Sequence, residues 1–369
     1  MISTPVQKTE YLLMNKDSPV LSFYCVRNEF GEPEFFEIGR FSDYLPIGYN
    51  DIGQYLEHRK APKHRAHIKE LLERYGCDDL EGFIKVAHAL SLNDTFWVKE
   101  SGSDLVWRDV SLYTNSFNTL ISEAAFDGTL SETDISSTSP EFGTDGYYAK
   151  CWIRGENEIR LIKSGSALNV LEPYSEFFSS QLAEIICTAS VKYDLCSYHG
   201  KLSSSCPLFT SESLGLAKMN SVFGREVTVP VLLEYFDSLG SADAFRRMCV
   251  LDAIILNPDR HYGNFGVLFN NDTLEVLGMA PVFDNNRALF PELNNEKLSN
   301  PAWYIERCKP RIGTDFLITA RLLMTGEIRS DLKNLQGFKL KNHDELPISA
   351  ERLELLNRLI NSRINELLS

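Results

Sequence analysis

The segment that decides the fold reads Asn257-Pro258-Asp259-Arg260-His261-Tyr262-Gly263-Asn264. An apolar run with helical spacing precedes it at 251–256, and an apolar run typical of a strand follows it at 265–269. Beyond an Asn270-Asn271-Asp272 turn, the chain reads Pro281-Val282-Phe283-Asp284. A carboxylate and a carboxamide therefore share one short loop, and the strand after it leads to a second carboxylate.

This order of side chains is typical of a phosphoryl-transfer site. In such a site one acidic group meets the incoming hydroxyl, and here that group is Asp259. An amide oxygen and a second carboxylate can hold magnesium on nucleotide phosphates, so Asn264 and Asp284 are the predicted metal ligands. The structural alternative is a helix-ending turn, because Pro, Asn and Asp favour turns. The second carboxylate after the strand favours the site over the turn.

The same residues carry a resemblance to a known family. Asp259-Arg260-His261-x-x-Asn264, followed by a strand and Pro281-x-Phe283-Asp284, resembles the catalytic and metal-binding segments of HipA-type bacterial serine/threonine kinases. Phosphoinositide kinases share the Asp-x-His-x-x-Asn order, whereas the common protein kinases place the His before the Asp. The resemblance covers residues 140–290 and implies an α+β, bilobal protein-kinase-like fold. It also implies ATP and Mg²⁺ as cofactors and a serine or threonine hydroxyl as the acceptor.

Two predicted strands upstream, at 147–153 and 158–163, form a hairpin around a Gly155-Glu156-Asn157 turn. By the resemblance, Lys163 at the end of the second strand contacts the ATP phosphates, and Gly143 and Gly146 belong to the loop that covers them. The loop is a weak match, because it has only two glycines. Lys150 on the first strand is the rival lysine, and an exposed strand-end lysine is the structural alternative for Lys163.

A helix is predicted to begin near Glu176, with Ser175 as its N-cap. HipA-type kinases carry a glutamate in an early helical position like this one, and the resemblance makes Glu176 the ion-pair partner that positions Lys163. The alternative is a first-turn glutamate that only complements the helix dipole. Glu184, two turns further along, is the other possible partner.

Composition restricts the classes of partner. The formal net charge of −14 argues against general nucleic-acid or anionic-membrane binding, because the field of the whole molecule repels polyanions. The eight cysteines include no C-x-x-C pair, which fits reduced thiols better than disulfides or a zinc site. No apolar run approaches membrane-spanning length. We therefore expect a cytoplasmic protein whose partners are ATP and an unidentified protein substrate.

Residues 1–126 are predicted to form a separate α+β domain of unknown role. Its strands are expected at 20–26 and 35–38, with a hairpin of strands at 96–98 and 105–107.

Residues 127–369 are predicted to be the HipA-like kinase domain, with a small lobe at about 140–212 and a large lobe at about 213–369. The amphipathic segment 348–368 is expected to be a helix that packs on the large lobe.

The segment 131–144 is rich in hydroxyl side chains and precedes the predicted hairpin. HipA-type kinases phosphorylate themselves in the loop that covers the nucleotide, so the resemblance implies modification of Ser136, Ser137 or Ser139. The alternative is a plain linker whose hydroxyls never meet the site.

Two other functions share these motifs. One is a phosphoinositide or small-molecule kinase, and the other is a catalytically inactive, nucleotide-binding interaction protein. The complete set of Asp259, Asn264 and Asp284 argues against the inactive alternative.

Overall fold

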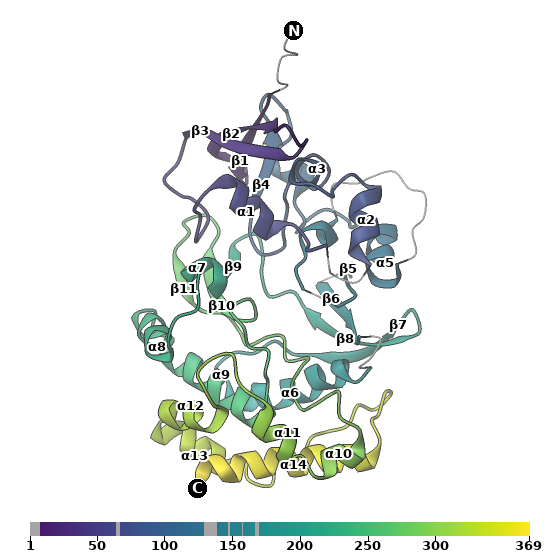
Figure 1. Cartoon of the computed structure of the whole chain (residues 1–369), viewed down its shortest axis with the longest axis vertical. Coiled ribbons are helices and arrows are strands. Elements are labelled where there is room, and N and C mark those ends of the chain that lie inside the picture. The colour runs from purple at the N-terminus through teal and green to yellow at the C-terminus, as the bar shows by residue number, and fades with distance from the viewer. Residues whose placement is uncertain (1–7, 64–66, 129–138, 147, 157, 167–169) are drawn as a thin grey trace. The chain divides into compact units, whose positions relative to one another are not determined.

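The computed structural model (Figure 1) describes the chain except for residues 1–7, 64–66, 129–138, 147, 157 and 167–169. It divides into two compact units. The first unit combines three segments that are far apart in the sequence, namely Met1–Leu161, Leu208–Ala217 and Phe269–Glu275. The second consists of Ile162–Pro207, Lys218–Leu268 and Val276–Ser369.

The first unit is built on an antiparallel sheet with the strand order β3-β2-β1-β4. The strands are β1 (Thr9–Asn15), β2 (Ser18–Arg27), β3 (Pro33–Arg40) and β4 (Phe96–Glu100). Alternate side chains of a strand point to opposite faces, and both faces of β1 are covered, whereas the edge strand β3 is largely exposed. Leu13 packs in one apolar cluster with residues of the surrounding helices, whereas Met14 packs in another with Trp97 and Trp107.

The helices of the first unit supply the cover for this sheet. They are α1 (Ile52–Arg59), α2 (Ile68–Arg74), α3 (Leu80–Ala87), α4 (Trp107–Val110) and α5 (Thr119–Asp127). The Asp51 and Asp79 side chains cap α1 and α3, because each carboxylate accepts a hydrogen bond from a first-turn N–H.

Of the hairpin predicted at 96–107, only the first strand forms, so the prediction of the second strand is wrong. The strand β4 forms as expected, but Trp107 begins the short helix α4. The Lys99 ammonium donates to the carbonyl oxygens of Ser103 and Leu105, and the Trp107 N–H donates to the Asp17 carboxylate. These backbone groups are therefore satisfied by side chains instead of a strand ladder.

Residues 127–161 group with the N-terminal segment, whereas the sequence suggests a domain boundary after 126. The short 3-10 helix η1 (Pro140–Gly143) places Phe142 in the main apolar cluster of the first unit. The carboxylate of the neighbouring Glu141 accepts hydrogen bonds from the Ser122 hydroxyl and from the backbone N–H of Trp152. Trp152 lies on β5 (Lys150–Arg154), so η1 ties this strand to α5.

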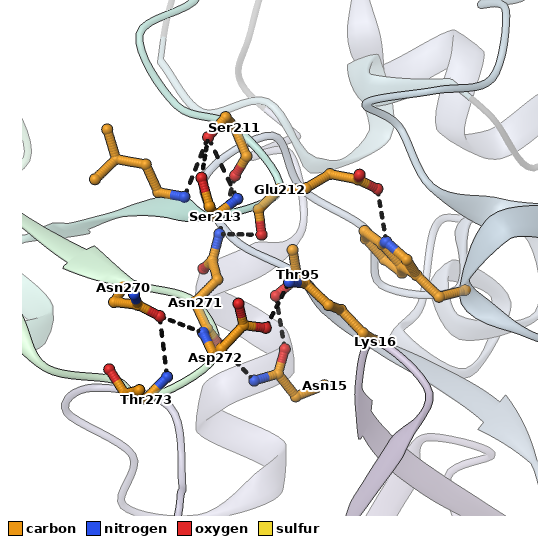
Figure 2. A network of polar contacts seen from close by, with 12 residues as sticks. Asn15, Lys16, Thr95, Ser211, Glu212, Ser213, Asn270, Asn271, Asp272 and Thr273 are labelled. Carbon is orange, nitrogen blue, oxygen red and sulfur yellow. Dashed lines mark hydrogen bonds and ion pairs between the residues drawn. The ribbon is translucent and has the colours of Figure 1, made fainter.

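A polar network explains why two later segments also belong to the first unit (Figure 2). The Asn271 side chain is fully buried and donates to the carbonyl oxygen of Ser211 at 3.0 Å. The backbone carbonyl oxygen of Asn271 accepts from the Asn15 side chain at 2.7 Å, and Lys16 pairs with Asp272 at 2.5 Å. Asn15 and Lys16 are thereby bonded to Asn271 and Asp272, each 256 positions away, and Asn271 in turn bonds to the segment that contains Ser211.

The second unit is mainly helical. Its helices are α6 (Glu172–Ile186), α7 (Met219–Phe223), α8 (Val229–Ser238), α9 (Ala242–Ile255), α10 (Asn295–Ser299), α11 (Ala302–Arg307), α12 (Phe316–Leu323), α13 (Gly326–Asn334) and α14 (Ala350–Leu368). Helix α9 is almost entirely buried, and α6, α8, α12 and α14 all pack on it. The expected C-terminal helix therefore forms as α14, at the yellow end of the chain in Figure 1.

The remaining strands are β6 (Ile159–Ser164), β7 (Asp194–Tyr198), β8 (Lys201–Pro207), β9 (Leu214–Lys218), β10 (Gly266–Asn270) and β11 (Val276–Met279). β8 lies between β6 and β7, and β10 lies between β9 and β11. Within the described part of the chain, no helix has the length and apolar character that crossing a bilayer takes.

Candidate active site

Three charged side chains from distant parts of the second unit meet in its interior. β6 delivers Lys163, whose ammonium lies 2.7 Å from a carboxylate oxygen of Glu176 on α6. The same ammonium lies 2.9 Å from a carboxylate oxygen of Asp284. Lys163 and Glu176 are both buried, and the Asp284 side chain is 24% exposed. The structure therefore brings together three of the residues that the sequence identified.

The Lys163 ammonium is held in its charged form by its two partners. Burial alone lowers the pKa of this ammonium, but the carboxylates of Asp284 and Glu176 outweigh burial and raise it above its usual value. Burial also raises the pKa of Glu176, an effect that the Lys163 ammonium and the Asn285 N–H oppose. A buried ammonium with one partly exposed carboxylate partner is suited to neutralising phosphate charge.

The structure also bears on three alternatives to this arrangement, an exposed Lys163, Glu184 as its partner and Lys150 as the rival lysine. Lys163 is buried and paired, so it is not an exposed strand-end lysine. Glu184, the other possible partner, is half-exposed and lies 3.7 Å from Lys192. Lys150 belongs to the first unit, where its ammonium donates to the carbonyl oxygen of Asp145.

The helix that carries Glu176 begins earlier than the sequence suggests. Helix α6 starts at Glu172 with Pro173 in its first turn, so Ser175 lies inside the helix, and its prediction as the N-cap is wrong. The Glu172 carboxylate accepts a hydrogen bond from the Ser166 N–H and pairs with Arg287 at 3.1 Å. The additional turn places Glu176 in the second turn of α6 instead of at the start of the helix.

Asp284 adopts a backbone conformation that is uncommon for a non-glycine residue. Its φ is +57°, in the left-handed region, which costs of order 1–3 kcal/mol when the surrounding structure imposes it. The Tyr193 hydroxyl accepts a hydrogen bond from the Asp284 N–H at 3.1 Å. Next to it, the Asn285 N–H donates to the second oxygen of Glu176 at 2.7 Å. The backbone at 284–285 is thus fixed by Tyr193, just before β7, and by Glu176 of α6.

The loop between α9 and β10 holds Asp259 by its backbone. The Asn257 side chain accepts from the Asp259 N–H, and the Asp259 carbonyl oxygen accepts from the His261 N–H and the Asn264 side chain. The carboxylate itself is half-buried. Burial raises the pKa of Asp259, and Asp284 raises it further, whereas His261, Arg287 and Arg311 oppose the shift.

Arg260 organises this loop, a role that the sequence did not reveal. Its side chain is 1% exposed and contacts both carboxylate oxygens of Asp252 on α9, at 3.1 and 3.0 Å. The same guanidinium donates to the carbonyl oxygens of Asn264 and Phe283 and to the Asn285 side chain. One buried side chain therefore connects the helix before the loop, the end of the loop and the residues around Asp284.

The only signal in the sequence for the Asp252–Arg260 pair is the spacing of the two residues. Asp252 and Arg260 lie on either side of the helix end at Leu256, where φ is +52° and the chain reverses. The arginine, eight positions after the acid, can therefore return to contact it. The His261 ring accepts a hydrogen bond from the Gly263 N–H within the loop.

The residues predicted to bind magnesium offer the oxygen atoms that this ion prefers. The Asn264 amide nitrogen donates to the Asp259 carbonyl oxygen, so the amide oxygen is left for another partner. Asp284 contributes a partly exposed carboxylate. Among the described residues, no group of three or more His, Cys, Asp or Glu side chains is placed to share a metal ion. This donor set fits Mg²⁺, which is usually held by one or two protein oxygens together with substrate phosphates.

The two predicted loop glycines lie in the first unit. A Cβ on Gly143 would lie 2.3 Å from the carbonyl oxygen of Leu90, so close backbone packing requires glycine there. Gly146 has a φ of +102°, and a Cβ on it would lie 2.2 Å from the Lys150 ammonium. Gly143 thus has a packing reason and Gly146 a conformational one, and their contact with ATP stays a prediction.

We expect Glu176→Gln to lower kcat/KM for ATP roughly 10- to 100-fold, because a neutral amide replaces the charged partner of Lys163. The matched control is Glu184→Gln on the same helix, whose half-exposed carboxylate is expected to contribute nothing measurable. Steady-state kinetics of both variants test the assignment. Equal activity of the two variants would show that the buried pair does not serve the reaction.

Comparisons with known proteins gave matches of structure only. No protein-family model matches this sequence, and no curated protein matches it. HipA of Shewanella oneidensis MR-1, from a toxin–antitoxin complex with HipB and operator DNA, matches with a TM-score of 0.52 at 10% identity, over 96% of each chain. The Helicobacter pylori proinflammatory kinase CtkA matches with a TM-score of 0.47 at 18% identity, over 62% of this chain and 92% of its own.

The likeness to HipA confirms the predicted α+β, HipA-like kinase fold. Because the match covers 96% of this chain, it includes most of the N-terminal segment 1–126, for which the sequence motifs gave no counterpart. This segment is therefore part of the shared fold.

Proposed function

We propose that this chain is an ATP- and magnesium-dependent kinase of the HipA-like type that transfers the γ-phosphoryl group of ATP to a serine or threonine hydroxyl. The observation that carries the proposal is the buried contact of Lys163 with both Glu176 and Asp284. A lysine–glutamate pair beside a metal-binding aspartate is the constellation that kinases need in place before transfer. The cytoplasm, where ATP is abundant, is the proposed location.

Each residue has a defined part in this reaction. Lys163 neutralises phosphate charge, and Glu176 keeps its ammonium in place. Asp259 accepts or orients the proton of the incoming hydroxyl, and its raised pKa suits a group that must take up a proton. Asn264 and Asp284 would hold Mg²⁺, which when bound neutralises charge on the phosphates. Positioning and charge stabilisation account for the rate, because phosphoryl transfer asks for little covalent chemistry from the protein.

Nucleotide and metal binding are expected to be coupled. ATP should raise the Tm of the wild type only in the presence of Mg²⁺, because Asn264 and Asp284 reach the phosphates through the ion. Asp284→Asn should remove most of that rise, and thermal-shift titrations with ATP, Mg²⁺ and both together measure it. An equal rise with ATP alone in both proteins would contradict the metal assignment.

Transfer itself is tested with γ-labelled ATP. The purified protein is incubated with labelled ATP and Mg²⁺, and phosphorylated sites are mapped by mass spectrometry. Phosphoserine or phosphothreonine supports the proposal. Label transferred only to a phosphoinositide or a small molecule would identify that class of kinase instead. Binding of Mg²⁺ and ATP without transfer would identify an inactive, nucleotide-binding interaction protein.

Self-phosphorylation of the 131–144 segment is part of the same proposal. Ser136 and Ser137 lie outside the described residues, whereas Ser139 is 2% exposed. We therefore expect phosphate on Ser136 or Ser137 before Ser139. A phosphoserine carries a charge of about −1.5 to −2, so it would be repelled by ATP phosphates and lower nucleotide affinity. Phosphosite mapping on the wild type beside Asp259→Asn tests this, and equal phosphate in both proteins would contradict it.

A further inference from the structure

Helix α6 is bonded on its outer side to a segment near the C-terminus, residues 338–346, here named the C-terminal strap. The Gln181 side chain donates to the Lys341 carbonyl oxygen and accepts from the Lys341 N–H, both at 2.9 Å. One turn earlier, the Phe177 ring lies 5.5 Å from the His343 ring, edge to face. The Tyr174 hydroxyl donates to the Leu346 carbonyl oxygen at 3.1 Å. These α6 residues follow helical spacing, so one face of α6 carries all three contacts.

His343 is the centre of the strap. Its Nδ1 accepts hydrogen bonds from the N–H groups of Glu345 and Leu346, at 3.2 and 3.0 Å. Because both backbone groups donate to Nδ1, the proton of the ring lies on Nε2, which contacts the Asp194 carboxylate at 3.1 Å. His343 thus shapes the strap, packs on α6 and connects both to the first residue of β7.

A cavity of about 670 Å³ lies between α6, residues 192–195 and the strap. On this side of α6 close apolar packing therefore does not fill the interface, and separate polar and ring contacts join the helix to the strap. Tyr193 forms part of the cavity wall, and its hydroxyl accepts from the Asp284 N–H. Phe177, also in the wall, directly follows Glu176. The cavity wall therefore includes one residue that bonds to the Asp284 backbone and one that is next to Glu176 in the sequence.

We propose that Gln181 and His343 are positioning residues that keep α6 where Glu176 meets Lys163. This inference rests on the proposed kinase function. The 2.7 Å contact between Glu176 and Lys163 requires α6 to stay close to β6, and the strap opposes outward movement of the helix. Loss of the strap contacts weakens the Glu176–Lys163 pair without touching any atom of either residue.

The test is a double-mutant cycle. Gln181→Ala with His343→Ala is expected to lower kcat/KM for ATP roughly 2- to 30-fold, the usual range for residues that act at a distance. In a Glu176→Gln background, the same two changes should lower activity no further, because they act through Glu176. An additive loss would overturn the inference. The control is Gln336→Ala, which removes an exposed side-chain hydrogen bond to Asn365 and should change nothing.

A second measurement does not depend on activity. Hydrogen–deuterium exchange of the α6 amides should rise in the Gln181→Ala, His343→Ala protein and stay at the wild-type level in Gln336→Ala. Raised exchange supports the strap even if the wild type transfers no phosphate, in which case only the proposed function fails. Unchanged exchange in α6 overturns the strap whatever the activity.

Discussion

Asp259→Asn is expected to lower phosphoryl transfer by roughly 10²–10⁴ while nucleotide affinity stays within a few-fold of the wild type. The amide keeps the shape of the side chain. The bonds that hold the loop, from the Asp259 N–H to the Asn257 side chain and from the Asn264 side chain to the Asp259 carbonyl oxygen, do not use the carboxylate. The variant is therefore expected to bind nucleotide nearly as well as the wild type while transferring phosphate far more slowly. Single-turnover transfer and Mg²⁺-dependent ATP titrations measure the two quantities, and a fully active Asp259→Asn protein would falsify the role of this residue.

The same variant carries a prediction for stability. Burial raises the folded-state pKa of Asp259 above its unfolded value, so the ionised carboxylate disfavours the fold at every pH above the folded pKa. Asn removes that charge, and the Tm of Asp259→Asn at neutral pH should equal or exceed the wild-type Tm. The difference should vanish as the pH falls below the ordinary Asp pKa of about 3.9, where both states of the wild type are protonated. Thermal melts across pH check this; a lower Tm at neutral pH would contradict it.

Arg260→Met is expected to cost about 3–5 kcal/mol in the free energy of unfolding of the second unit. The change leaves the buried Asp252 carboxylate without the guanidinium that contacts both of its oxygens. It also removes the bonds to the carbonyl oxygens of Asn264 and Phe283, so transfer activity should fall as well. Urea unfolding monitored by circular dichroism measures the loss.

Two further variants make this prediction specific. Arg260→Met combined with Asp252→Leu should recover part of the stability, because no unpaired buried charge remains. Arg307→Met is the control: this half-exposed arginine lies 3.5 Å from Glu306, and its loss should cost at most about 1 kcal/mol. If the Arg260 and Arg307 variants lose similar stability, the buried pair is not the structural centre that its contacts indicate.

Much of the site could be predicted from the order of residues in the sequence. Asp259 and Asn264 share one loop, and a helix and a strand flank it as the periodicity indicates. The structure places Asp284 beside Lys163, so the second carboxylate after the strand does belong with the lysine of the hairpin. Periodicity and turn residues are local signals, and the loop with its flanking helix and strand depends on such signals.

Other parts could not be predicted in this way. Ser175 has the chemistry of an N-cap, but Pro173 can occupy the first turn and packing of α6 extends the helix back to Glu172. Trp107 ends a run with strand character. Its ring, however, is buried in the second apolar cluster of the first unit, and its backbone N–H donates to the Asp17 carboxylate. In both places tertiary contacts outweighed local propensity.

The sequence by itself determined which residues are available for chemistry: a loop with Asp259 and Asn264, a strand lysine, a helical glutamate and a second aspartate. Only the tertiary structure decided which of them meet. Lys163 and Asp284 are 121 positions apart, and their contact depends on how α6, β6 and the backbone at 284–285 pack together. The Arg260–Asp252 pair and the return of residues 208–217 and 269–275 to the first unit have the same origin. Such contacts depend on which segments pack together and form complementary hydrogen bonds, and that choice of partner leaves no periodic pattern along the chain.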